Sequence, residues 1–438
     1  MAQCFTTSAP RNLKPLKRPQ PKMHRPPRPK RSNEPMVGLR TLLVLLITMF
    51  VLAPMSGCLD NEEEKPPGFQ WPDRAETGCL GEDVNASCEV YLDGFTTPTN
   101  SLHHPTKNEV WISDLDGRIV AWDGGQQRLV ANISNLISNC HTEAGLLGFS
   151  FATDFANASQ VLFTYIGKAN CETKEVTNLY LASGDVVNGT VAENSVRVLR
   201  EIEQPYRNHN GGHLLALGDH TYLWGVGDGG GSNDPQGHGQ NETSPLGTIQ
   251  HFHYHNGTIA PLHNTTGTDQ DYTLHRGLRN PWKFDVDAQN RLWIADVGQQ
   301  CFEEVSMVPV LQASNFGWSE REGNREFTDP SDCTKPASEP PAEMTDPVLI
   351  YEHENGRCSI TGGLFMDWGP EAWQGGYLYG DFCTGEIWRT TEGADGSYDG
   401  ELLIDTETML VGFGKGLDGE LLLFTWTGTV YSLDTSGV

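Results

Sequence analysis

The chain has 438 residues, of which 37% are hydrophobic, 9% aromatic and 20% charged, and it contains 48 glycines and 26 prolines. This composition is too aromatic for a disordered chain and too rich in glycine for a helical bundle, so we expect a β-rich protein with many tight turns. The net charge of −27 understates the acidity of the body of the chain, since ten of the 30 basic residues lie within residues 1–40, and an acidic surface excludes nucleic acids and anionic lipid headgroups as partners.

Residues 1–57 are predicted to be a basic leader and signal segment. The apolar run at 41–53 is too short for a transmembrane span of ~20 residues but is typical of a signal peptide. It ends in Met55-Ser56-Gly57-Cys58, which resembles a bacterial lipobox with Cys58 as the lipid-attachment residue, and residues 58–94 would then hold that cysteine and an acidic tether. A plain secretory signal and an uncleaved anchor are alternatives, and Met36 is a second candidate for the start. The expected location is extracytoplasmic, either secreted or lipid-anchored to the outer face of the cell membrane.

The cysteines agree with export. Beyond Cys58 there are eight, and an even number in an exported chain predicts four disulfides, for which 105 pairings exist. Cys-x-x-Cys is absent from the sequence, which disfavours zinc and thioredoxin-like sites. Seven Asn-x-Ser/Thr sequons indicate surface loops in a glycosylating host. Proximity in the sequence favours the pairs Cys79–Cys88, Cys140–Cys171, Cys301–Cys333 and Cys358–Cys383.

A short pattern recurs along the body of the chain. Each copy has an apolar strand and a small or acidic turn that contains glycine, and several copies continue into a second apolar strand. This pattern predicts β-hairpins with glycine where the turn needs a positive φ. The copies lie at 109–122, 160–167, 222–229, 291–298, 376–388 and 420–431.

The spacing of these copies distinguishes a propeller from a sandwich. Intervals of roughly 45 to 85 residues suit propeller blades, whereas a sandwich would turn every ~8–12 residues. We therefore predict an all-β fold, a six-bladed β-propeller of four-stranded antiparallel blades, over residues 95–438. In such a fold the ligand site is assembled from loops of several blades on one face.

The segments 208–212 and 227–231 carry candidate catalytic residues. His209 lies between two amides and next to paired glycines, and an imidazole with an ordinary pKa near 6.5 suits proton abstraction. Asp228 ends the next strand of the same predicted hairpin, so its carboxylate could orient that imidazole. Two ordinary turns are the plainer interpretation of these segments.

A second group of candidates follows in the chain. Arg279 stands beside a turn fixed by Pro281 and could hold an oxyanion. Gly298 and Gln299 form a turn flanked by carboxylates, including Glu303, which could offer oxygen ligands to Ca²⁺. A surface ion pair and a solvated turn are the plainer interpretations.

Taken together, nine segments occur in the order typical of one family. They are Glu143–Gly148, Asp154-Phe155, His209–Gly212, Gly227–Gly230, Leu278–Trp282, Trp293–Gln299 with Glu303-Glu304, Asn315–Trp318, Cys358–Gly363 and Gly380–Cys383. Over about residues 95–434 the chain resembles the soluble glucose/sorbosone dehydrogenase family. That family of six-bladed propellers includes PQQ-dependent aldose sugar dehydrogenases and the propeller of Hedgehog-interacting protein.

The resemblance implies an exported oxidoreductase that depends on PQQ and Ca²⁺. It would oxidise the anomeric hydroxyl of an aldose, or of a similar polyol, to a lactone and pass the electrons to an external acceptor. By the same resemblance, His209 would take the hydroxyl proton and Asp228 would steady the imidazole. Arg279 would stabilise charge on the quinone oxygen, and Asn280 would lie against the cofactor.

The resemblance also implies a cofactor-associated Ca²⁺ site. The carbonyls of Gly298 and Gln299 would bind the metal, Gly298 would also contact the cofactor, and Glu303 completes the expected metal set. One alternative is a propeller of the Hedgehog-interacting kind that recognises a ligand or protein without catalysis. It is favoured by His213, Thr248 and Glu386, which stand where family members often carry a cation. The other alternative is a propeller with different chemistry, such as a Ca²⁺-dependent lactonase.

Overall fold

The computed structural model describes residues 79–80, 86–138, 140–263, 266–328 and 332–434. The predicted leader and signal segment, the lipid-attachment residue Cys58 and most of the predicted tether lie outside the described residues. Within the described part of the chain, no helix is long and apolar enough to cross a membrane.

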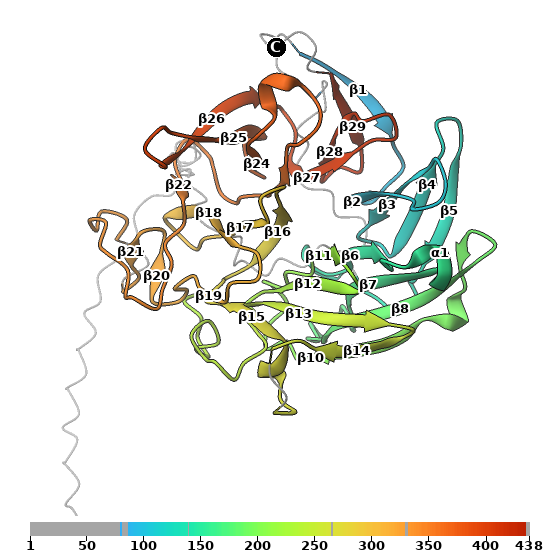
Figure 1. The fold of residues 1–438 in the computed structure, drawn as a ribbon, viewed down its shortest axis with the longest axis horizontal. Helices are drawn as coiled ribbons and strands as arrows, with labels where there is room; N and C mark the ends of the chain where they lie inside the picture. Colours follow the sequence, from blue (N-terminus) through green and yellow to red (C-terminus); the bar gives the residue numbers. More distant parts are fainter. Residues whose placement is uncertain (1–78, 81–85, 139, 264–265, 329–331, 435–438) are drawn as a thin grey trace, which may run out of the picture. The chain divides into compact units, whose positions relative to one another are not determined.

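Six antiparallel sheets of the described residues are arranged in a ring (Figure 1), and we call them blades 1 to 6. Blade 1 consists of β2 (Pro98–His103), β3 (Val110–Asp114), β4 (Arg118–Trp122) and β5 (Gln127–Asn132). Blade 2 consists of β6 (Leu146–Phe151), β7 (Gln160–Ile166), β8 (Leu179–Val187) and β10 (Arg197–Ile202), with β9 (Thr190–Val191) paired to β8.

Blades 3 and 4 follow in chain order. Blade 3 consists of β11 (Leu214–Gly218), β12 (Thr221–Val226), β13 (Thr248–His255) and β15 (Thr273–Arg276), with β14 (Thr258–Pro261) paired to β13. It also gains β19 (Ser314–Asn315), which runs parallel to β15. Blade 4 consists of β16 (Pro281–Val286), β17 (Arg291–Asp296), β18 (Phe302–Pro309) and β22 (Leu349–Glu352).

Blades 5 and 6 complete the ring. Blade 5 consists of β23 (Leu364–Phe365), β24 (Tyr377–Gly380), β25 (Glu386–Glu392) and β26 (Tyr398–Asp405). Blade 6 consists of β27 (Leu410–Lys415), β28 (Leu421–Thr425), β29 (Val430–Asp434) and β1 (Ser87–Leu92). Outside the blades lie the hairpin of β20 (Arg321–Glu322) and β21 (Arg325–Glu326), the helix α1 (Phe155–Ala158), and 3₁₀ turns at Glu193–Ser195, Asp269–Tyr272 and Glu371–Trp373.

The predicted fold is therefore confirmed. Each of the six recurring segments contains the second strand of a different blade, which explains why their spacing matched one blade per copy. The hydrophobic core is divided in the same way, because each of six clusters of buried side chains lies between two neighbouring blades. Trp111, Trp224 and Trp293, from the second strands of three blades, are fully buried in these clusters.

The ring is closed by the N-terminal strand. β1 pairs antiparallel with β29, so that Cys88 lies opposite Leu433 at the outer edge of blade 6. The sheet therefore takes in Ser87–Leu92, which the sequence analysis assigned to the tether, because blade 6 has only three strands of its own.

The four predicted disulfides are confirmed. The structure contains Cys79–Cys88, Cys140–Cys171, Cys301–Cys333 and Cys358–Cys383. Each disulfide joins two cysteines that are 9 to 32 residues apart in the sequence. Of the sequon asparagines, Asn157, Asn188, Asn241 and Asn256 are exposed and Asn132 is half-buried, as expected for surface loops.

Candidate active site

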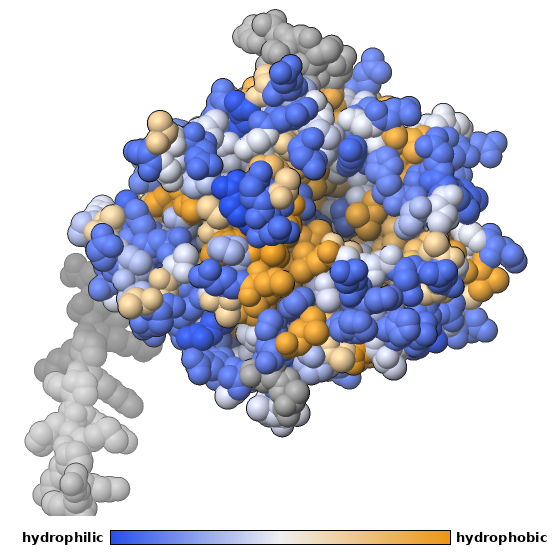
Figure 2. All heavy atoms as spheres, in the orientation of Figure 1, coloured by the Kyte–Doolittle hydropathy of each residue, from blue (hydrophilic) through white to orange (hydrophobic). Residues whose placement is uncertain are grey.

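A cavity opens at the centre of the ring and is lined by residues from five blades. These residues precede or begin the first strand of a blade, or follow its second strand, so the alternating strand directions bring them to one face. Figure 2 shows hydrophobic side chains gathered near the centre of the face in view and hydrophilic ones around its rim. The lining residues that matter below are Glu143, Asn280, Trp282, Thr361, Phe382 and Trp426.

His209 and Asp228 form a buried pair next to this cavity. His209 precedes β11 and Asp228 follows β12, so the hairpin of blade 3 brings them together. His209 Nδ1 lies 2.8 Å from Asp228 Oδ1, and neither side chain is exposed. His209 itself has a positive φ of 56°. The second carboxylate oxygen of Asp228 accepts a hydrogen bond from the Trp318 indole at 2.8 Å.

The surroundings keep Asp228 ionised. Burial alone would raise the pKa of its carboxyl, but His209, Arg279 and the backbone N–H of Gly230 outweigh burial and hold the pKa below its usual value. An ionised carboxylate on Nδ1 fixes the imidazole so that Nε2 is the nitrogen that can accept a proton.

Arg279 and Asn280 come from blade 4 and lie beside the pair. Both carboxylate oxygens of Asp296 hold the turn, because they accept the backbone N–H groups of Arg279 at 2.9 Å and of Asn280 at 2.7 Å. The carbonyl of Arg279 accepts the backbone N–H of Asp228 at 2.8 Å. The Arg279 guanidinium is buried, donates to the Gly298 carbonyl at 2.8 Å and lies 5.6 Å from the Trp318 ring centroid. The structure thus brings together His209, Asp228, Arg279 and Asn280, as the sequence predicted.

Glu143 lines the cavity and contacts the buried pair. Its carboxylate accepts the backbone N–H of His209 at 2.7 Å and lies 3.5 Å from the Asn280 side-chain amide, which in turn accepts the Gly211 N–H at 3.0 Å. Sequence analysis placed Glu143 in a family motif but gave it no role. The signal that could have found it is its position just before β6, in the same place within blade 2 that His209 holds within blade 3.

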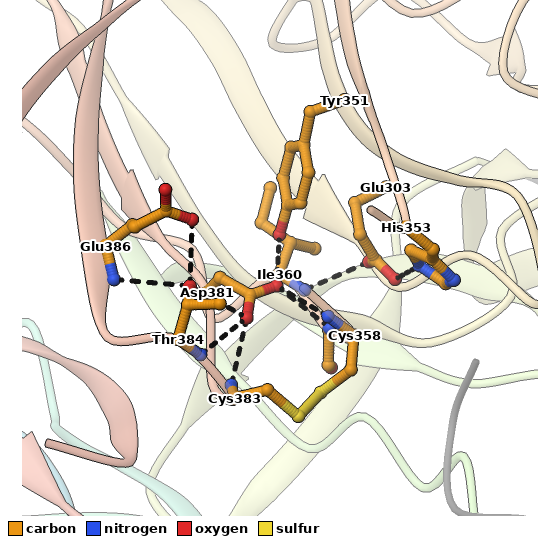
Figure 3. The surroundings of a disulfide bond; sticks show 10 residues. Glu303, Tyr351, His353, Cys358, Ile360, Asp381, Cys383, Thr384 and Glu386 are labelled. Atoms are coloured by element: carbon orange, nitrogen blue, oxygen red, sulfur yellow. Dashed lines mark hydrogen bonds and ion pairs between the residues drawn. A yellow bond between two sulfur atoms is a disulfide. The ribbon is translucent and has the colours of Figure 1, made fainter. Parts of the chain in front are cut away.

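The predicted metal ligands are arranged differently from the expectation. Glu303 is fully buried, and both its carboxylate oxygens are occupied. Oε1 lies 2.5 Å from His353 Nε2, and Oε2 accepts the Ile360 N–H at 3.0 Å (Figure 3). Oε2 also accepts the Gly298 N–H at 3.1 Å. Burial raises the pKa of Glu303, although His353 and Ile360 act against it. The Gly298 carbonyl accepts a hydrogen bond from the Arg279 guanidinium, as described above.

These contacts do not fit a Ca²⁺ site at Glu303. The Gln299 side chain is also engaged, since its Oε1 accepts the Asn233 N–H at 2.5 Å. A calcium ion takes six to eight oxygen ligands, and this segment presents carboxylates already satisfied by protein donors.

One wall of the cavity is a loop held by a disulfide. Asp381 Oδ2 accepts the N–H groups of Cys358 and Ser359, each at 3.0 Å, and the Tyr351 hydroxyl, also at 3.0 Å (Figure 3). Its Oδ1 accepts the N–H of Cys383 at 2.9 Å. Residues 358–361, which line the cavity, are therefore fixed by one carboxylate and one covalent bond.

Lys283 and Thr361 are polar groups that sequence analysis missed. The Thr361 hydroxyl and the Lys283 ammonium are buried and make no hydrogen bond with a described residue. Lys283 Nζ lies 5.0 Å from the centroid of the Trp282 ring, which lines the cavity. Burial lowers the pKa of Lys283 to about 7. Burial, and secondarily Lys283, lower the pKa of His213 well below its usual value.

The fold and this site define a six-bladed propeller with a buried histidine–aspartate pair beside its central cavity. The chain belongs to the Glucose / Sorbosone dehydrogenase family, which it matches over residues 95–429. The resemblance drawn from the sequence motifs is thereby confirmed.

Two curated relatives match part of the chain. The HIPL1 protein of Arabidopsis thaliana is 28% identical over 255 residues, which is 52% of this chain and 36% of that protein. Quinoprotein glucose dehydrogenase B of Acinetobacter calcoaceticus is 23% identical over 256 residues, covering 53% of this chain and 52% of that protein. The match thus spans about half or less of the length of these relatives.

Solved structures share the fold. The PQQ-bound aldose sugar dehydrogenase of Streptomyces coelicolor has a TM-score of 0.60 at 18% identity, covering 80% of this chain and 98% of that one. The apo-form of the soluble aldose sugar dehydrogenase of Escherichia coli has a TM-score of 0.63 at 18% identity, covering 81% and 100%. At this level of identity the likeness shows the propeller fold alone.

Proposed function

We propose that this protein is an exported quinoprotein dehydrogenase that oxidises the anomeric hydroxyl of an aldose, or of a similar polyol, to a lactone and passes the electrons to an external acceptor. The observation that carries the proposal is the buried His209–Asp228 pair with the Arg279 guanidinium beside it. Family membership and the quinoprotein among the relatives support it. The four disulfides support export, because such bonds persist in oxidising compartments.

The aromatic rings of the cavity lining suit PQQ, which is a flat aromatic tricarboxylate. Trp282, Phe382 and Trp426 offer flat apolar walls. The Thr361 hydroxyl, which makes no hydrogen bond with a described residue, offers a donor for a carboxylate. The Lys283 ammonium does not line the cavity but lies 5.0 Å from the centroid of the Trp282 ring that does, and it adds positive charge nearby. Asn280 would lie against the cofactor. When bound, PQQ would supply the acceptor for the hydride that leaves the anomeric carbon.

In this proposal the protein handles the proton. Nε2 of His209 accepts the proton of the anomeric hydroxyl as the hydride leaves, and the Asp228 carboxylate stabilises the resulting imidazolium. Arg279 provides positive charge where an oxygen becomes negative. Its position is set by the Gly298 carbonyl and the Trp318 ring, so it needs little rearrangement during the reaction.

A second function, ligand recognition without catalysis, is favoured by the burial of His209 and by the negative charge of the cavity lining. The His209 side chain is not exposed, and the charged residue that lines the cavity is Glu143. A propeller that recognises a neutral or cationic ligand, without catalysis, would need neither an accessible imidazole nor a cofactor.

Cofactor uptake separates these functions. Purified protein is mixed with micromolar PQQ and Ca²⁺, and reduction of an artificial dye is followed with a panel of aldoses. We expect uptake and turnover in the wild type. In His209→Ala, turnover should be lost while PQQ binding is kept, and Arg279→Ala should weaken both. His103→Gln, which changes an exposed histidine of blade 1, is the matched control. The absence of PQQ uptake would eliminate the dehydrogenase proposal and leave the recognition function.

A further inference from the structure

A cluster of histidines lies at one end of blade 3, where it faces Asp154 of blade 2. β13 carries His253 and His255 on one face of the strand, and His220 stands in the turn between β11 and β12. The ring centroid of His220 lies 5.4 Å from that of His253 and 4.9 Å from that of His255. Asp154, at the start of α1 in blade 2, faces them, with carboxylate oxygens 3.9 Å from His220 Nδ1 and 3.8 Å from His255 Nδ1.

We propose that Asp154, His220 and His255 bind a divalent transition-metal ion of the Zn²⁺ type. Their three ligand atoms lie within 4.8 Å of one another. Zinc bonds of about 2.1 Å place tetrahedral ligands roughly 3.4 Å apart, so any two of these side chains must together close a gap of at most about 1.4 Å to complete the site. Two imidazoles and one carboxylate suit borderline ions such as Zn²⁺, whereas Ca²⁺ takes oxygen ligands. Water or His253 would supply a fourth ligand.

Two of the ligand groups lack the hydrogen bonds that their positions would otherwise provide. Asp154 occupies the N-cap position of α1, where a carboxylate normally accepts a backbone N–H, but its side chain makes no capping hydrogen bond. Nδ1 of His220 is shielded from solvent and makes no hydrogen bond with a described residue. A metal ion between these two groups would satisfy both.

The backbone around His220 is already fixed. Its N–H donates to the Thr153 hydroxyl at 3.0 Å, and its carbonyl accepts the Tyr254 N–H at 2.8 Å. Thr153 is itself held, because its N–H donates to the Tyr222 hydroxyl at 2.7 Å. On the other ligand, Nε2 of His255 lies 3.1 Å from the Asn256 side-chain amide nitrogen. A metal-bound His255 would donate from Nε2, so this amide would turn its oxygen toward the ring to accept that N–H.

The site lies at the end of the blades away from the candidate active site. Asp154 follows the first strand of blade 2 and His220 follows the first strand of blade 3, whereas the cavity residues precede or begin first strands or follow second strands. Blades 2 and 3 are neighbours in the ring (Figure 1). The metal would therefore link blade 2 to blade 3 through its ligands. This inference does not depend on the proposed function.

Zinc binding to the tag-free, full-length protein tests the site directly. Protein is dialysed against micromolar ZnCl₂, bound zinc is counted per chain, and the apparent melting temperature is measured with and without zinc. Three variants remove one ligand each: Asp154→Asn, His220→Asn and His255→Ala. Asn is chosen at His220 because it tolerates the positive φ of 64° found there. His103→Gln and His263→Ala are the controls.

We expect one zinc per wild-type chain and a rise in melting temperature that Ca²⁺ does not reproduce. Each ligand variant should bind zinc about tenfold more weakly or worse, with an unchanged melting temperature in zinc-free buffer, while the controls bind as the wild type does. Wild-type binding no tighter than that of His220→Asn would overturn the proposal. So would loss of zinc in His263→Ala alone, because that result would place the ion at the neighbouring pair of His251 Nδ1 and His263 Nε2, 3.2 Å apart.

Discussion

The buried ammonium of Lys283 should make the stability of this protein depend on pH in a specific direction. Burial lowers its pKa from 10.5 to about 7. At about 1.4 kcal/mol for each pKa unit, holding the charged form inside the folded protein costs at most about 5 kcal/mol below pH 7. Between pH 7 and 10.5 the unfolded chain still binds the proton that the folded protein releases, so this cost declines as the pH rises.

Lys283→Met removes the charge and keeps the length of the side chain. The variant should therefore be more stable than the wild type at pH 6, and the gain should shrink toward zero near pH 10. For a domain of this size about 5 kcal/mol corresponds to a rise of roughly 7 °C in melting temperature. Lys168→Met, at an exposed lysine, is the matched control and should show no such gain.

The assay is thermal unfolding of both variants and the wild type at pH 6, 8 and 10. A gain of the same size at every pH would show that packing, and not the buried charge, is responsible. Lower stability of Lys283→Met at pH 6 would mean that the ammonium has a favourable partner, and the reasoning would be refuted. In the proposed function, the same variant should also bind PQQ at least tenfold more weakly.

Asp228→Asn should reduce kcat by about 10² to 10⁴ in the dye assay, because the imidazole loses its orienting carboxylate; unchanged turnover would contradict that role. The pKa of Asp228 is held below its usual value, so its stabilising effect is present above about pH 4 and is lost as the pH falls through the folded-state pKa. As the pH falls below about 4, the free energy of unfolding of Asp228→Asn should therefore decrease less steeply than that of the wild type. An equal decrease in both proteins would contradict a lowered pKa of Asp228. Replacing Cys358 and Cys383 by alanine opens a loop of 25 residues and should cost about 3 kcal/mol, seen as a melting temperature lower by several degrees. Arg279→Lys should weaken PQQ uptake more than Lys168→Met does, since only the fork of a guanidinium can reach the Gly298 carbonyl and the Trp318 ring together.

The fold was readable from the sequence because each blade repeats one local signal. An apolar second strand that ends in a glycine turn marks every blade, and the burial of Trp111, Trp224 and Trp293 explains why tryptophan recurs there. His209 and Asp228 were also predictable as a pair, because they flank the two strands of one antiparallel hairpin.

The remaining features depend on contacts between blades, which local spacing does not encode. Glu303 lies in a carboxylate-rich turn, yet its partners His353 and Ile360 come from later parts of the chain and occupy its oxygens. Lys283 follows Trp282 in an ordinary strand pattern, and only the packed ring shows that its ammonium is buried. Asp154 and His255 face each other from different blades, and no motif joins them.

The pairing of β1 with β29 has a consequence for biosynthesis. β1 is synthesised before all the other described strands and β29 after them, so β1 cannot pair until β29 has been made. Ser87 and Asp434, which pair in this ladder, are separated by almost the whole described sequence. Until translation reaches that point, the growing polypeptide carries unpaired strand edges, which invite association with other chains. A truncated product that lacks β29 would keep this seam open, so quality control in the cell could recognise incomplete copies by their exposed edge.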